Sequence, residues 1–254
     1  MNTKYIGILL MAGKSTRMNG IVKQYYVSKD DDEPMYIHSL KTLASFMDDV
    51  ILVVPHGDEE KVKSQSFIFT KKFYPVISGG KNRTESVRNA LNFIKNMYFD
   101  VDIKVLIHDA ARPFVPSNII LNIKDALKNH DAVTPVLDMS DSLLKENDGI
   151  KYVDRTFIKR VQTPQGFDFN LIYEAYEELK EESKTDDFQM VLNKSKSPIL
   201  IQGSTLSFKV TNDDDLVIYD CLSYKFKQWK RKFKEKIDSD LLEYAYNIYQ
   251  YNYF

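Results

Sequence analysis

The sequence predicts a single α/β domain in which helices flank a mostly parallel sheet. Short apolar runs alternate with segments of helical periodicity, which is the pattern of successive βαβ units. The chain has 254 residues, of which 43% are hydrophobic and 28% are charged. This length and composition suit one soluble α/β domain with a large buried core.

The first half of the chain contains four apolar runs that predict strands, at residues 5–11, 50–54, 73–77 and 104–108. The run at 50–54 is rich in β-branched residues, as is typical of a central parallel strand. Apolar residues recur at helical spacing in two of the intervening segments. These segments, residues 35–46 and 84–94, are therefore predicted helices.

The second half continues the alternation. Ser117 is predicted to cap a helix that runs to residue 129, because a serine hydroxyl can accept a hydrogen bond from the first turn. The remaining predictions are strands at 132–137 and 199–201 and helices at 169–180 and 213–224. The sequence shows no internal repeat and no low-complexity linker.

Three turns with glycine or acidic residues follow directly after predicted strands. They contain Ala12-Gly13, Gly79-Gly80 and Asp109. Ligands of open α/β sheets bind outside the carboxyl ends of the strands. We therefore expect these turns to meet in one composite site.

The first of these turns has the character of an anion site. It reads Met11-Ala12-Gly13-Lys14-Ser15-Thr16-Arg17, and Lys23 follows six residues later. A strand that enters a glycine turn and then a helix aims backbone N–H groups at an anion, here a triphosphate. A P-loop is the first alternative, but its leading glycine would fall at Ile8. Taken by itself, the motif also fits a structural turn with exposed charges.

Charge and composition argue against several functional classes. The formal net charge of −1 gives no electrostatic case for nucleic-acid binding. No segment reaches the about 20 apolar residues that span a bilayer, and the apolar run at 6–12 is too short for a secretory signal. The single cysteine, Cys221, excludes an intramolecular disulfide and is expected to be a packing residue. These points favour a cytoplasmic protein with no nucleic-acid or membrane partner.

Five further motifs follow in a fixed order. They are Gly79-Gly80-Lys81-Asn82-Arg83-Thr84-Glu85-Ser86-Val87, His108-Asp109-Ala110-Ala111-Arg112-Pro113-Phe114, Thr163-Pro164-Gln165-Gly166-Phe167, Thr185-Asp186-Asp187 and Phe208-Lys209-Val210-Thr211. Over about residues 5 to 220 the chain resembles the 2-C-methyl-D-erythritol 4-phosphate cytidylyltransferases and their relatives, the ribitol-5-phosphate cytidylyltransferases. The resemblance implies a Rossmann-like fold and the transfer of CMP from CTP to a small polyol phosphate, with release of pyrophosphate.

The resemblance assigns catalytic roles to four charged residues. Arg17, Lys23 and Lys209 match the basic residues around the triphosphate and the transition state. Asp109 matches the carboxylate that holds Mg²⁺, a hard ion that binds one or two carboxylates together with substrate phosphates. A structural role for Asp109 in the following turn can coexist with this one. His108 is expected to be a packed histidine, because the attacking phosphate is already anionic and needs no base.

Further residues are assigned to the two substrates. Gly80 and Ser86 match positions that read the cytosine, and Arg83 is expected to brace their loop. The full nucleotide-binding set is Ala12, Gly13, Lys14, Ser15, Gly80, Arg83, Ser86 and Asp109. The acceptor-binding set is Arg112, Ser142, Arg155 and Asp186. An alternative role for Arg112 is to brace Asp109 or a subunit interface.

Two segments lie outside the catalytic motifs. Residues 138–161 match an arm that crosses to a second subunit, which implies a homodimer with Arg155 supplied by the partner. Residues 225–254 extend the nucleotidyltransferase domain of residues 1–224 and are basic and rich in tyrosine. Such a tail can bind RNA or a membrane surface. The favoured interpretation is two terminal helices that pack side chains such as Phe226 inward and solvate their lysines.

The chain departs from the family pattern at a few positions. Ser15 stands where a second glycine is usual, Ser207-Phe208 replaces Asn-Ile, and Asp141-Ser142 fills a position that is often Asp-Thr. These changes bear more on the acceptor than on the nucleotide. Methylerythritol phosphate is the expected acceptor and ribitol 5-phosphate is the alternative. A catalytically inactive nucleotide-binding regulator is the rival from another functional class.

Overall fold

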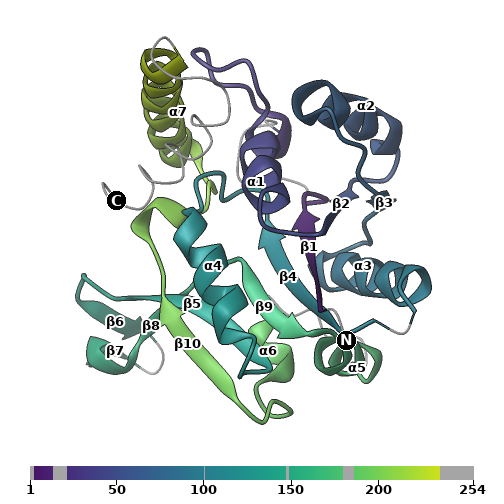
Figure 1. Ribbon diagram of the computed structural model, residues 1–254. Helices are drawn as coiled ribbons and strands as arrows, with labels where there is room; N and C mark the ends of the chain where they lie inside the picture. Colours follow the sequence, from purple (N-terminus) through teal and green to yellow (C-terminus); the bar gives the residue numbers. More distant parts are fainter. Residues whose placement is uncertain (1–2, 14–21, 100, 147–148, 180–185, 235–254) are drawn as a thin grey trace.

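A mixed, mostly parallel sheet forms the centre of the protein (Figure 1). The structure is a computed structural model and describes residues 3–13, 22–99, 101–146, 149–179 and 186–234, with side chains of the last segment described as far as residue 228. The strand order is β10-β5-β9-β4-β1-β2-β3, and β8 pairs with β5. This arrangement confirms the predicted α/β fold.

The parallel strands of the sheet, with β10 and β3 at its two edges, are formed by predominantly apolar segments. They are β1 (Lys4–Leu10), β2 (Asp49–Val54), β3 (Val76–Ser78), β4 (Ile103–Asp109), β5 (Ala132–Asp138) and β10 (Pro198–Gln202). β1 pairs in parallel with both β2 and β4. Because all three strands are buried on both faces, their sequences show no polar alternation.

Helices cover both faces of the sheet (Figure 1). One face packs against α1 (Met35–Ala44), α2 (Glu59–Thr70) and α4 (Ser117–Ala126). The other packs against α3 (Arg83–Met97), α5 (Phe169–Glu177) and α6 (Phe188–Val191). Alternate residues of β1 serve the two layers, since Ile6 and Ile8 face the second layer and Leu9 faces the first.

One strand of the sheet runs against the others. β9 (Gln165–Asp168) lies antiparallel between β4 and β5. Its start therefore lies toward the carboxyl end of β4, where Ile107 pairs with Gln165. This reversal brings the Thr163-Pro164-Gln165 motif to the same sheet edge as Asp109.

The described part of the segment 138–161 consists mainly of short strands. It forms a two-stranded hairpin of β6 (Leu143–Glu146) and β7 (Ile150–Val153), the 3-10 helix η2 (Arg155–Phe157) and β8 (Lys159–Val161). Several large apolar side chains of this arm are exposed: Leu144, Ile150, Tyr152 and Phe157.

The long helix α7 (Asp213–Lys234) closes the described chain. Its side chains Leu216, Tyr219 and Phe226 form a third core cluster together with Met35, Phe114 and Val210. Burial of Phe226 agrees with the inward packing expected of the tail, whose residues from 235 onward lie outside the described part. α7 runs without a break across the expected domain boundary at 224/225. None of the helices in the described ranges is long and apolar enough to cross a membrane.

Three local expectations are wrong. Ser117 does not cap α4: it is the first helical residue, and the extended residue Pro116 occupies the N-cap. Cys221 is exposed on α7 and is not a packing residue. The third strand begins at Val76 instead of residue 73, because Phe73 is 71% exposed and stacks on Phe67 of α2.

Candidate functional site

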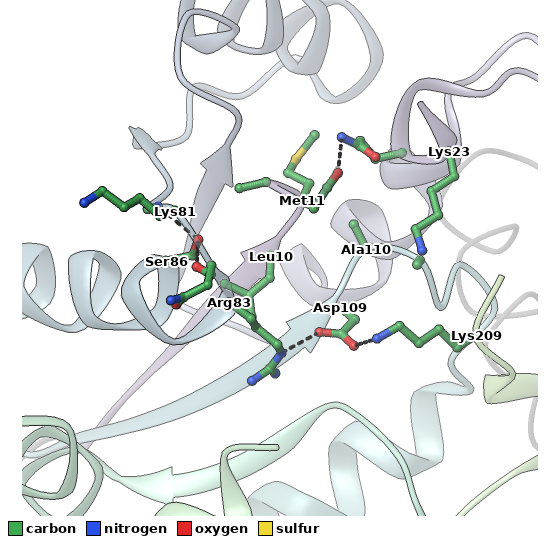
Figure 2. Close-up of a pocket in the computed structure, with 15 residues that line it drawn as sticks. Leu10, Met11, Lys23, Lys81, Arg83, Ser86, Asp109, Ala110 and Lys209 are labelled. Carbon is green, nitrogen blue, oxygen red and sulfur yellow. Dashed lines mark hydrogen bonds and ion pairs between the residues drawn. The ribbon is translucent and has the colours of Figure 1, made fainter. Parts of the chain in front are cut away.

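A pocket opens at the carboxyl ends of β1 and β4, where the three glycine or acidic turns meet. It is lined by Leu10, Met11, Ala12, Gly13, Lys23, Gln24, Gly80, Lys81, Asn82, Arg83, Ser86, Asp109, Ala110, Ala111 and Lys209. Figure 2 shows Asp109 at the end of its strand, with Arg83 and Lys209 reaching it from opposite sides. The structure thus brings together the residues that the sequence places after separate strands.

Glycine is required where the second turn approaches the first. A Cβ on Gly79 would lie 2.4 Å from the Cβ of Ala12, and a Cβ on Gly80 would lie 2.2 Å from that of Glu85. The hydroxyl of Ser86 accepts a hydrogen bond from the Gly80 N–H at 3.0 Å and donates to the Asn82 carbonyl at 2.8 Å. Ser86 therefore fixes the loop that leads into α3 as well as facing the pocket.

The Asp109 carboxylate is the electrostatic centre of the pocket. Lys209 Nζ lies 2.6 Å from Oδ2, and Arg83 Nε lies 3.3 Å from Oδ1. Burial opposes ionisation of Asp109, but the charges of Arg83 and Lys209 outweigh it and hold the pKa of this carboxyl well below its usual range. Asp109 is therefore an anion with lone pairs still available on both oxygens.

Arg83 joins Asp109 to a second carboxylate. Its two terminal nitrogens donate to Asp187 at 2.7 and 2.6 Å, in a bidentate pair. Asp187 is fully buried and also accepts a hydrogen bond from the Tyr176 hydroxyl at 2.5 Å. Burial would lower the pKa of Arg83, but Asp187 and Asp109 together raise it well above its ordinary value. The expected bracing role of Arg83 thus has a specific partner, Asp187.

Lys23 lines the same pocket from the short 3-10 helix η1 (Lys23–Tyr25). Its ammonium donates to the carbonyl of Val210 at 3.1 Å. Val210 N–H in turn donates to the Ala111 carbonyl at 2.8 Å. Lys23 and Lys209, two of the lysines that line the pocket, are thereby tied to one backbone segment.

A second pocket adjoins the first and shares Arg83, Asp109 and Lys209 with it. Its other lining residues are Arg112, Val161, Gln162, Thr163, Asp186, Phe188, Gln189 and Leu192. Asp186 accepts a hydrogen bond from Gln165 Nε2 at 2.6 Å, and its pKa is raised, mainly by burial. Arg112 donates from Nη1 to the Ser207 carbonyl at 2.7 Å, while its buried Nε has no hydrogen-bond partner among the described residues.

A pocket lined by basic side chains that continues into a second pocket is suited to joining two phosphorylated molecules. Comparison with known proteins identifies the family to which the chain belongs. The profile of the IspD family, 2-C-methyl-D-erythritol 4-phosphate cytidylyltransferase, matches residues 6–222. The chain belongs to the IspD family. This family is one of CTP-dependent cytidylyltransferases, which are nucleotidyltransferases.

Curated relatives and solved structures agree with membership of the IspD family. A 2-C-methyl-D-erythritol 4-phosphate cytidylyltransferase of Thermotoga neapolitana is 33% identical over 89% of this chain and 98% of its own. One of Clostridium botulinum is 36% identical over 83% of this chain and 93% of its own. The crystal structure of 4-diphosphocytidyl-2C-methyl-D-erythritol synthase from Anaerococcus prevotii has a TM-score of 0.73 at 24% identity, covering 89% and 96% of the two chains, which supports the fold.

His108 is buried at the end of β4, as the sequence predicts. Its Nδ1 lies 3.0 Å from the Thr163 hydroxyl and its Nε2 lies 3.1 Å from the Arg112 carbonyl. Burial lowers the pKa of His108 to about 4, so the ring is neutral near pH 7. A neutral imidazole fixed at both nitrogens braces the turn after Asp109.

The described chain does not bring every expected acceptor residue to the pockets. Ser142 is exposed at the start of the arm, and Arg155 donates from Nη1 to the Ser140 carbonyl within the arm. Neither lines the two pockets of the single subunit. Three further expected residues, Lys14, Ser15 and Arg17, lie outside the described residues.

Asp109 has the donor chemistry of a magnesium ligand. Its carboxylate is ionised and lines the first pocket. Within the described residues no group of three or more His, Cys, Asp or Glu side chains is arranged to hold a metal. A single carboxylate suits a divalent cation that takes its remaining ligands from phosphate oxygens and water, as Mg²⁺ does in nucleotide sites.

Sequence reasoning missed Asp187, Tyr176 and Gln165 as parts of the site. Asp187 was visible beside Asp186 in the Thr185-Asp186-Asp187 motif, but its partner Arg83 is 104 positions away. Gln165 was visible in its motif too. Tyr176 carries no sequence signal that distinguishes it from other buried residues of α5.

Proposed function

We propose that this protein transfers CMP from CTP to 2-C-methyl-D-erythritol 4-phosphate in the synthesis of isoprenoid precursors. The observation that carries the proposal is the pair of adjoining pockets that share Arg83, Asp109 and Lys209. The first pocket takes CTP and the second takes the acceptor. The shared residues then stand where the new phosphoanhydride bond forms.

The reaction needs alignment and charge neutralisation more than proton transfer. A phosphate oxygen of the acceptor attacks the α-phosphorus of CTP, and the bond from that phosphorus to the bridging oxygen of the β-phosphate breaks. Pyrophosphate leaves with the electron pair of that bond. Lys23 and Lys209, together with Arg17 of the first turn, neutralise the negative charge that develops on the phosphates.

We propose Mg²⁺ as the cofactor, held by Asp109 together with the triphosphate. When bound, the ion neutralises phosphate charge and orients the triphosphate for in-line attack. Lys209 and Arg83 keep Asp109 ionised, so that the carboxylate is available as a ligand without loss of a proton. Arg112, which lines the second pocket, donates to the acceptor phosphate there.

The alternatives carry less support. Relatives from several genera are named for methylerythritol phosphate, which disfavours ribitol 5-phosphate as the acceptor. A P-loop NTPase does not agree with membership of the IspD family. An inactive nucleotide-binding regulator is disfavoured because Lys23, Asp109 and Lys209 line one pocket. The expected cytoplasmic location stays a prediction.

Pyrophosphate release tests the proposed reaction. The protein is mixed with CTP and Mg²⁺ and offered methylerythritol 4-phosphate or ribitol 5-phosphate in parallel. Release with methylerythritol phosphate alone supports the proposal, and release with ribitol 5-phosphate alone reassigns the acceptor. CTP binding without release under either condition favours the regulator.

We further propose that the arm of residues 138–161 joins two copies of the chain and delivers Arg155 to the partner's acceptor pocket. Exposed apolar side chains on the arm and the exposed Arg155 support this arrangement. A complementation experiment tests it with Lys209→Ala and Arg155→Ala. In a mixed dimer, one pocket then combines a native Lys209 with a native Arg155 from the other subunit. Activity regained on mixing supports delivery across the dimer, and its absence in confirmed mixed dimers contradicts it.

A further inference from the structure

Helix α7 continues past the end of the match to the IspD family profile. The family profile ends at residue 222, whereas α7 runs to Lys234. Two side chains in this additional length contact the domain. The ring of Phe226 is 7% exposed and stacks on Phe114 with 5.1 Å between centroids. Lys227 Nζ lies 2.9 Å from Asp32 Oδ2.

Phe114 connects α7 to the segments that carry the charged site residues. It follows Asp109 by five positions and also stacks on Tyr219 of α7 at 5.4 Å. Its ring lies 6.4 Å from that of Phe208, the residue before Lys209. Phe226 therefore packs on Phe114, an aromatic ring that follows β4 in the chain and lies beside the segment of Lys209.

The segment that follows Lys23 is fastened to the same helix. The Tyr26 hydroxyl donates to Asp220 Oδ2 at 2.9 Å, and Asp32 pairs with Lys227. The rings of Tyr26 and Tyr219 meet edge to face at 5.9 Å. α7 therefore contacts three segments at once, residues 22–34, 109–114 and 207–211.

We propose that the additional length of α7 is a positioning element of the reaction, in which Phe226 holds the segments of Lys23 and Lys209 in register. The proposal rests on the proposed cytidylyltransferase function. Neither Phe226 nor Lys227 is among the residues that line the two pockets of the site, so both would act on the reaction through other residues. A displacement of catalytic groups by about 1 Å can lower the rate on the order of 100-fold, so a small shift of Lys209 would lower kcat measurably.

The test compares Phe226→Ala with Phe169→Ala. Phe169 is a matched control because it is 5% exposed, similar to Phe226, but begins α5 at the opposite edge of the sheet. Both variants are expected to lose stability. Only Phe226→Ala is expected to lower kcat, by about 10- to 100-fold, at a temperature where both are fully folded. Phe226→Leu, which restores most of the apolar volume, is expected to recover most of this loss.

Hydrogen exchange provides a readout that is independent of turnover. Phe226→Ala should increase amide exchange in residues 22–34 and 205–212, and Phe169→Ala should not. Equal kcat losses in the two alanine variants, or unchanged exchange in both segments, would overturn the positioning role. If the wild-type protein releases no pyrophosphate with either acceptor, the proposed function fails. The exchange result then still decides whether α7 holds these segments.

Discussion

Lys209 Nζ and Asp109 Oδ2 lie 2.6 Å apart although 100 positions separate the two residues in the chain. Arg83 contacts the other oxygen of the same carboxylate. The first pocket is therefore organised around one anion between two cations. Removal of the anion leaves two cations close together, whereas removal of either cation leaves the carboxylate with one partner, so the three variants are informative in different ways.

Replacement of Asp109 by alanine is expected to lower pyrophosphate release by at least about 100-fold. The change removes the carboxylate that both cations contact and that would hold Mg²⁺. Steady-state assays over a range of Mg²⁺ concentrations measure the effect. Asp125→Ala, which removes an exposed carboxylate of α4, serves as the control. Near-normal activity of Asp109→Ala at ordinary Mg²⁺ would refute the metal role.

Lys209→Ala is expected to reduce kcat much more than it weakens CTP binding. The lysine neutralises charge that grows in the transition state, so kcat should fall by about 100-fold or more. The dissociation constant of CTP, measured by calorimetry, should change by less than about tenfold. Lys128→Ala controls for the loss of a surface lysine. Equal losses in the two quantities would mean that Lys209 acts on the bound ground state alone.

Asp187→Asn should destabilise the fold as well as the site. It leaves the guanidinium of Arg83 without its bidentate partner in a buried setting, at a cost of about 3–5 kcal/mol. Tyr176→Phe removes only the hydroxyl that donates to Asp187 and should cost about 1.5–3 kcal/mol. Urea unfolding of both variants gives the free energies. A loss below about 1 kcal/mol for Asp187→Asn would argue against a structural ion pair.

Gly79→Ala should destabilise the protein by about 1–3 kcal/mol, because the new methyl group collides with Ala12 across the two turns. Gly13→Ala is the matched control, since a Cβ there meets nothing within 4 Å. Thermal unfolding of the two variants without nucleotide isolates this packing effect from ligand binding. Equal stability of the two variants would show that the two turns can move apart with no loss in the free energy of unfolding.

Acid should destabilise the protein through His108. In the unfolded chain a histidine titrates near its ordinary pKa of about 6.5, whereas burial lowers the folded value to about 4. The unfolded state thus binds more protons in this window, and stability falls as the pH is lowered. Linkage gives a loss of about 2 kcal/mol between pH 7 and pH 5. Urea unfolding with a chelator present measures it, and His108→Asn should lose less over the same interval if His108 is responsible.

The sequence predicts the sheet core and most of the helices because their signals are local. The buried strands are continuous apolar runs, and α3 carries its apolar residues at helical spacing. Helix α2 was not predicted, because only Val62 and Ser66 of it are buried and its sequence therefore has no apolar stripe at helical spacing. β9 escaped because its polar and glycine residues do not resemble a strand, and its direction is fixed only by pairing with β4 and β5.

The candidate site was predictable to the extent that its residues lie in turns after strands. Gly80, Asp109 and Lys209 meet as expected, since each belongs to a motif with its own charge or glycine signal. The Arg83–Asp187 pair was not predictable in this way, because two buried charges find each other only after the sheet and α5 are in place. Arg155 lines neither of the two pockets of the single chain, so its proposed contact with the acceptor depends on the proposed second copy of the chain.

The long separation between paired charges also sets an order of events during synthesis. Arg83 and Asp109 leave the ribosome well before their partners Asp187 and Lys209, which are 104 and 100 positions further along. A nascent chain of 180 residues already contains the nucleotide turns but lacks both partners. Competence to hold a nucleotide is therefore expected only after Lys209 has been made, shortly before the synthesis of α7, which begins at Asp213.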